Sequence, residues 1–160
     1  MTLEVTDSQA LLDVSSKPQI ITVNALGDNQ SPSGMTLRAA IDAANANGPG
    51  EDIIEIDARV GDIQLIASIG PHTINSDVTL RAIGDARTVR PFNTHQLSLL
   101  HIGDQATVTI ENMVFSGGST AGDGGAIRNE GDLTLERVHI ANSTSTGGDG
   151  GGVFNASSAT

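Results

Sequence analysis

The feature that most constrains this chain is an internal repeat in its second half. Residues 108–115 align with residues 133–140 at an offset of 25, and residues 122–129 align with residues 148–155 at an offset of 26. An earlier copy starts at Val78, 30 residues before Val108. Apolar–polar–apolar triplets recur in these copies. A repeat of this length with such triplets is typical of a solenoid, in which each copy forms one coil.

The composition agrees with stacked coils. The chain has 160 residues with 19 Gly and 3 Phe and without Trp, Tyr or Cys, so Val, Ile, Leu and Ala must fill its core. Alternate side chains of each strand are expected to point into the bore, and coils stack ~4.8 Å apart. Val78 should therefore lie below Val108, and Val108 below Leu133. The same short strands could form a sandwich, but the repeat favours an all-β fold of the parallel β-helix type.

Residues 36–47 carry the strongest helical pattern. Leu37, Ala40, Ile41 and Ala44 form one apolar stripe, and Thr36, or Ser33 one turn earlier, can cap the N-terminus. A helix of about three turns is too short to be stable alone, so the stripe must cover another element. We expect it to close the N-terminal end of the bore. Residues 1–50 then form an N-terminal strand and capping-helix region, and residues 51–160 form the coils.

A family resemblance rests on residues 35–47 and 52–57. They resemble the CSLREA-type N-terminal module of bacterial right-handed parallel β-helix repeat proteins. Residues 124–129 and 150–155 are similar to the repeats of polymorphic outer-membrane proteins. The resemblance implies a right-handed parallel β-helix with a short N-terminal capping α-helix and an extracellular setting, but no reaction. Three departures stand out: Met35, Thr36 and Ala39 replace the family's Cys, Ser and Glu, and the last change removes the Glu with which Arg38 would pair.

The charge of the chain limits its partners. The formal net charge is −11, from 19 acidic and 8 basic residues, which excludes nucleic acid and disfavours anionic lipid. No apolar run is long enough for membrane insertion. We expect a secreted or cell-surface protein with an unknown surface or polysaccharide partner. The first residues lack secretory-signal features, so the signal was removed, or export depends on a C-terminal signal, or the protein stays inside.

Candidate site residues gather around the glycine-rich repeats. Asp123, Arg128, Glu130 and His139 are the best available catalytic set, although ordinary solvated turns explain them better. Asp123 and Asp149 occupy equivalent positions and could bind calcium, but their flanking residues lack the register of calcium-binding repeats. We therefore expect no cofactor, with calcium as the weaker alternative.

Two further groups of residues have structural explanations. Asn129 and Asn155 are equivalent by repeat, and stacked amides can form a hydrogen-bonded ladder between coils. His72, His95 and His101 show no metal-ligand spacing, so packing or surface roles are expected for them.

Three functions remain open at this level. The sequence favours a non-catalytic structural or adhesive module, the capped N-terminal end of a β-helix protein. The alternatives are the N-terminal part of a polysaccharide lyase or hydrolase, with most catalytic coils beyond residue 160, and a calcium-stiffened binding module. Residues 155–158 offer no capping element, so we expect the solenoid to be truncated there. The coil of Val153 and Phe154 should then either fray after about Gly147 or self-associate end to end.

Overall fold

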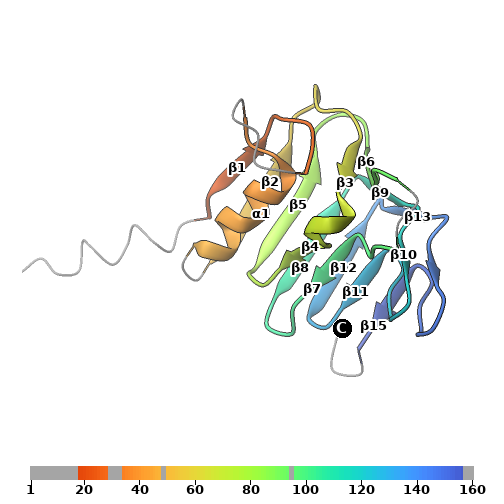
Figure 1. Cartoon of the computed structure of the whole chain (residues 1–160). Helices are drawn as coiled ribbons and strands as arrows, with labels where there is room; N and C mark the ends of the chain where they lie inside the picture. The colour runs from red at the N-terminus through yellow and green to blue at the C-terminus, as the bar shows by residue number, and fades with distance from the viewer. Residues whose placement is uncertain (1–17, 29–33, 48–49, 94–95, 157–160) are drawn as a thin grey trace, which may run out of the picture.

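The computed structural model describes residues 18–28, 34–47, 50–93 and 96–156. His95 lies outside these residues. The fold is the predicted one, a right-handed parallel β-helix of about four turns with one short α-helix. Its strands stack in three main parallel sheets that run along the solenoid axis (Figure 1).

Each turn contributes one strand to each main sheet. The first sheet contains, in spatial order, β1 (Ile20–Val23), β2 (Asp52–Ile56), β5 (Val78–Ala82), β8 (Thr107–Glu111) and β12 (Asp132–Glu136). The second sheet contains β3 (Ile63–Leu65), β6 (Arg87–Pro91), β9 (Met113–Ser116) and β13 (His139–Ala141). The third contains β4 (His72–Ile74), β7 (Leu100–Ile102), β11 (Ile127–Asn129) and β15 (Val153–Asn155). A small fourth sheet pairs β10 (Ser119–Thr120) with β14 (Thr144–Ser145), and a 3₁₀ turn, η1, spans Ala67–Ile69.

The register confirms the repeat. Val78 pairs with Val108, and Val108 pairs with Leu133, so the predicted column is present in the first sheet. In the third sheet Ile127 pairs with Val153, as the offset of 26 residues requires. The spacing of the repeat therefore predicted which side chains stack on one another.

Single residues with positive φ turn the chain from the first sheet into the second. Asn112 separates β8 from β9 with φ 56°, and Arg137 separates β12 from β13 with φ 53°. Asn tolerates this left-handed conformation better than most residues. The Asn112 side chain also donates to the carbonyls of Ala82 and Gly84, at 3.1 and 2.8 Å, in the turn before it. Arg137 lacks a side-chain amide that could make the corresponding hydrogen bonds to the turn before it.

The bore is filled by stacked aliphatic side chains. The largest fully buried side chains come from all three sheets and the helix: Phe115, Leu37, Ile41, Ile54, Ile56, Ile63, Leu65, Ile74, Leu80, Leu99, Leu100 and Ile102. In the last turn the inward side chains are more exposed to solvent. Leu135, which aligns with the buried Ile110, is 38% exposed. Burial of apolar surface is the main stabilising term of such a stack.

The helix α1 (Leu37–Ala46) covers the N-terminal end of this stack (Figure 1). Thr36 caps it, because its hydroxyl accepts a hydrogen bond from the Ala39 N–H at 3.2 Å. All four predicted stripe residues are buried. The helix packs against β1, β2 and β4. Its position and its buried face are as the apolar stripe predicted.

Some strands depart from the regular pattern of the coils. The apolar segment that starts at Leu97 forms a strand only from Leu100, because Leu97 instead makes an isolated antiparallel bridge with Ser119. The strand β6 forms although it ends in Pro91 and lacks a clear apolar–polar alternation. The short strands β10 and β14 form only because neighbouring coils bring them together.

Candidate functional site

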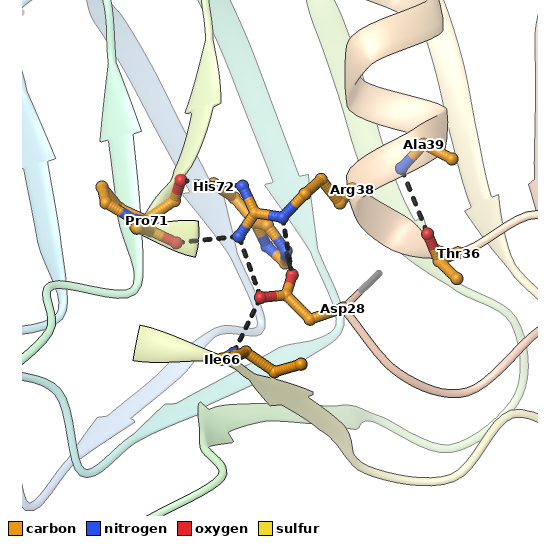
Figure 2. Close-up of polar contacts among 8 residues, drawn as sticks. Asp28, Thr36, Arg38, Ala39, Ile66, Pro71 and His72 are labelled. Carbon is orange, nitrogen blue, oxygen red and sulfur yellow. Dashed lines mark hydrogen bonds and ion pairs between the residues drawn. The ribbon is translucent and has the colours of Figure 1, made fainter. Parts of the chain in front are cut away.

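The most highly connected polar group of the described chain is a carboxylate under the capping helix. Asp28 lies in the loop that follows β1, and its side chain is fully buried. Its carboxylate accepts hydrogen bonds from Arg38, from Nε2 of His72 at 2.8 Å and from the Ile66 N–H at 2.8 Å (Figure 2). We call these four residues the Asp28 cluster. It joins the loop, the helix and the first turn at one point.

Arg38 is held to Asp28 by two parallel hydrogen bonds. Its Nε donates to Oδ1 at 2.9 Å and its Nη2 donates to Oδ2 at 3.0 Å. The remaining donors reach the carbonyls of Pro71 at 3.2 Å and Gly70 at 2.8 Å, just before β4. A planar guanidinium suits such a set of acceptors, because its donors have a fixed fork geometry. The Arg38 side chain therefore connects the helix to two other segments.

The protonation states in the cluster follow from burial and hydrogen bonding. Burial by itself would raise the pKa of Asp28, but the hydrogen bonds from His72, Arg38 and Ile66 outweigh it and lower that pKa to about 2. For His72, burial lowers the pKa despite the favourable contact with Asp28. His72 is then neutral at neutral pH, with the hydrogen on Nε2, while Asp28 is ionised. The net interaction is a buried Arg–Asp ion pair with a neutral imidazole as a further donor.

A second polar contact fastens the other side of the cap. Asp52 begins β2 at an inward position and is buried. Its carboxylate accepts from Asn47 Nδ2 at 2.8 Å, at the end of α1, and from the Gln19 N–H at 3.0 Å, just before β1. Asn45 adds a bond from α1 to the Thr73 carbonyl at 2.8 Å. Both ends of the helix are thus tied by hydrogen bonds to the first turn.

The Asp28 cluster has the properties of a structural ion pair that holds the cap in position. The carboxylate uses both oxygens within the protein, and the arginine donates to acceptors of three residues. Removing one partner of a buried ion pair leaves an uncompensated charge, which is strongly destabilising. An ionised, enclosed carboxylate is a poor general acid. The cluster therefore accounts for the position of the cap, not for a reaction.

The predicted catalytic set is only partly assembled. Arg128 Nη2 and Glu130 Oε1 are 2.6 Å apart, and Asp123 lines the same cleft as Arg128. His139 is in β13 of the second sheet, whereas Arg128 is in β11 of the third. The histidine that does join the set is His101, whose Nε2 lies 3.0 Å from Glu130 Oε2. That hydrogen bond, with the nearby charge of Arg128, lowers the pKa of Glu130.

The two aspartates considered for calcium do not share a ligand cage. Asp123 Oδ1 accepts from the backbone N–H of Asp149 at 2.9 Å, so one carboxylate already binds the next coil. Within the described residues, no group of three or more His, Asp or Glu side chains is arranged to hold a metal ion. The available calcium ligands are the Asp123 carboxylate, which already accepts one hydrogen bond, and the exposed side chain of Asp149.

The asparagine ladder is present. Asn129 is buried, and its Nδ2 donates to Asn155 Oδ1 at 2.6 Å and to the Gly131 carbonyl at 3.0 Å. Its Oδ1 accepts from the Gly131 N–H at 3.2 Å. Asn129 thus fixes its own turn and connects it to the next one.

Comparison with models of protein families, with curated proteins and with solved structures gives no match. The function is therefore argued from this geometry. In the parts of the chain that the structure describes, no helix has the length and apolarity needed to span a membrane.

Sequence reasoning missed Asp28 and the role of His72. Arg38 was expected to lose its ion-pair partner, because Ala39 stands where the resembled family has Glu; the structure supplies Asp28 instead. A signal for His72 was present in the repeats. His72 aligns with Leu100 and Ile127 in the third sheet, so a polar residue interrupts an apolar column at the turn next to the cap. Asp52 interrupts the column of Val78 and Val108 in the same way.

Proposed function

We propose that this chain is a non-catalytic structural module, the capped N-terminal end of a secreted or cell-surface β-helix protein. The observation that carries the proposal is the Asp28 cluster. It fastens the loop and the helix over the first turn and includes His72, the polar residue at an inward position of β4. A solenoid end needs such a cover, because an open end exposes apolar side chains and unpaired strand edges.

Hydrogen exchange tests the capping role. In the variant Arg38→Ala, Gly70 and Pro71 lose their donor and Asp28 loses its countercharge. The amides of β2 and β4 should then exchange faster than those of β8 and β9, because opening begins at the cap. Arg59→Ala is the control, since Arg59 is exposed in a loop of the same turn. Equal protection in the wild type and in Arg38→Ala would refute the capping role.

We also propose that the module is displayed at the cell surface and binds a partner there. The acidic surface suits a soluble, displayed module, and the proposed partner is a surface or a polysaccharide. The surface proposed for end-to-end self-association is the coil that contains Val153 and Phe154. Protease treatment of intact cells that produce the protein tests display. Digestion of the chain without lysis is expected, and protection until lysis would contradict the proposed location.

A polysaccharide lyase or hydrolase is the alternative, and one observation weighs against hydrolysis. A glycosidase needs a general acid whose pKa is raised, beside a second carboxylate. The pKa of Glu130 is lowered by its hydrogen bond with His101 and by Arg128. A carboxyl group whose pKa is lowered is a poorer proton donor, so Glu130 does not match the general acid that hydrolysis needs. Release of reducing ends or unsaturated sugars from polysaccharides by the purified chain would support the enzyme instead.

A further inference from the structure

The outward side of the third sheet carries a row of side chains, one from each turn of the solenoid. Thr73, His101, Arg128 and Phe154 are the central residues of β4, β7, β11 and β15, and they pair in register. The flanking residues of β4, β7 and β11 are buried, so the central residues of these strands point outward, and β15 continues the same register. Figure 1 shows the four strands side by side along the axis. We call these residues the outward row. It places an imidazole, a guanidinium and a phenyl ring on consecutive turns.

A cleft of about 290 Å³ runs beside the middle of this row. Its lining combines Pro71 and Leu97 with polar groups of neighbouring turns, among them Gln96, Ser98, Thr120 and Asp123. His101 and Arg128 form part of the same lining. Phe154 extends the row by one further turn, next to Arg128. The cleft is thus mostly polar, and Phe154 lies outside its lining, one turn further along the row.

The polar groups of the cleft are held in place before any ligand arrives. Glu130 pairs with Arg128 at 2.6 Å and with His101 at 3.0 Å. Asp123 is oriented by the Asp149 N–H, and Ser98 Oγ donates to the Gly124 carbonyl at 2.7 Å. Side chains fixed in this way lose little conformational entropy on binding. These polar side chains are therefore preorganised for binding a ligand.

The charges decide which ligand fits. Glu130 neutralises Arg128, and Asp123 adds a negative charge, so the cleft offers no surplus cation for an anionic ligand. The net charge of −11 also repels anions. What remains are planar donors and acceptors, with the partly exposed phenyl ring of Phe154 on the next turn, and these groups suit the hydroxyl groups and the apolar face of a sugar ring. We propose that the outward row and its cleft bind a neutral oligosaccharide that lies along the solenoid axis.

This inference rests on the proposed function, because it names the ligand that the displayed module would bind. An array of neutral gluco-, xylo- and manno-oligosaccharides, with oligouronates for comparison, identifies the ligand class on the whole chain. The best neutral ligand is then titrated by calorimetry. Binding to a neutral class but not to oligouronates is expected. Failure of every neutral sugar to bind, or binding of oligouronates alone, would overturn the inference and leave the hydrogen-exchange test of the cap unaffected.

Matched variants locate the site. Arg128→Ala and Phe154→Ala should each weaken binding about tenfold or more, since each removes a direct contact. Arg90→Ala is the control for Arg128, because both arginines pair with a carboxylate and are 41% and 45% exposed. Phe92→Ala is the control for Phe154, since Phe92 is 59% exposed and lines a different pocket, with Leu26 and Ile66.

The controls also define the contrary result. Arg90→Ala and Phe92→Ala should leave the dissociation constant within about twofold of the wild type, which is below the effect of a lost contact. If these two abolish binding while Arg128→Ala and Phe154→Ala do not, the ligand binds elsewhere and the assignment is wrong. Arg128→Gln, which keeps a hydrogen-bond donor and most of the side-chain volume, provides a second test of the position should Arg128→Ala unfold.

Discussion

Asp28 and Arg38 form a bidentate ion pair, with Nε–Oδ1 and Nη2–Oδ2 distances of 2.9 and 3.0 Å, across the boundary between a loop and the capping helix. The carboxylate is fully buried, while the arginine side chain is only 16% exposed. Both residues reach the first turn, Asp28 through Ile66 and His72, and Arg38 through Gly70 and Pro71. The cap is therefore connected to the solenoid by polar contacts as well as by its apolar stripe.

Asp28→Asn should destabilise the chain strongly. The substitution keeps the shape but removes the charge, and its amide group would meet donors of Arg38, His72 or Ile66. Breaking one partner of a buried pair costs about 3–5 kcal/mol in free energy of unfolding. Urea unfolding at neutral pH measures this loss of unfolding free energy. Asp62→Asn is the control, because Asp62 pairs with Arg90 at the surface and should cost less than about 1 kcal/mol.

The stability of the chain should fall continuously on acidification. The pKa of Asp28 is lowered from 3.8 to about 2, so its contribution is complete above pH 3.8 and is lost as the pH falls towards 2. That shift corresponds to roughly 2 kcal/mol. The pKa of His72 is also lowered, so below pH 6.5 the unfolded chain takes up a proton that the folded chain does not. Both effects have the same sign.

Unfolding free energies measured between pH 7.5 and 2.5 test this profile. His72→Gln should remove the part of the slope that begins near pH 6.5, while the part below pH 4 persists through Asp28. Arg38 and Asp42 also act on the His72 charge, and neither changes in this variant. A wild-type stability that stays constant between pH 6.5 and 4 would contradict a neutral, buried His72.

The repeat made the coils predictable, because the spacing of apolar triplets directly encodes which residues stack. Val108 and Leu133 are 25 residues apart in sequence and pair in one sheet. The stripe of α1 was predictable for the same reason, since its period places Leu37 and Ile41 on one face. Both predictions depend on regular spacing.

The Asp28 cluster could not be predicted in this way. Asp28 and His72 are 44 residues apart, in segments without a shared repeat, and they meet only after the first turn closes under the cap. The spatial grouping of the catalytic candidates was not predictable for a related reason. His139 and Glu130 are close in sequence, but they belong to different sides of the coil, whereas His101 reaches Glu130 from the turn before. In a solenoid, neighbours in space are one turn apart in sequence.

Ile41→Asp should separate the cap from the coils. Ile41 is 2% exposed and lies in the stripe that packs on β1, β2 and β4. A charge placed there without a partner should cost several kcal/mol. Thermal unfolding followed by circular dichroism measures the loss, with Asp42→Ala as the control on the exposed side of the same helix. A variant that melts like the parent would show that α1 does not cover the bore.

Calcium should not stabilise the chain. Asp123 already accepts a hydrogen bond from the Asp149 N–H, and the surrounding glycines offer no further carboxylate. Any ligand that binds only the native state must raise the melting temperature, so calorimetry with millimolar CaCl₂ or EDTA is decisive. A rise in calcium that the variant Asp149→Asn abolishes would establish a calcium site between these two turns and favour the calcium-stiffened module.

Arg137→Asn should stabilise the chain. Arg137 has φ 53° at the turn where the equivalent residue of the preceding coil is Asn112, with φ 56°. A left-handed conformation is costly for Arg and less so for Asn, so the gain should be about 0.5–1 kcal/mol. Little is lost in exchange, because the Arg137 side chain is 66% exposed and its contacts with Glu111 and Glu136 are 3.8 and 3.9 Å long. Arg137→Ala separates the two effects, because it removes the same side chain but keeps the strain. If Arg137→Ala is as stabilising as Arg137→Asn in urea unfolding, the gain comes from the charge of the arginine and not from the backbone.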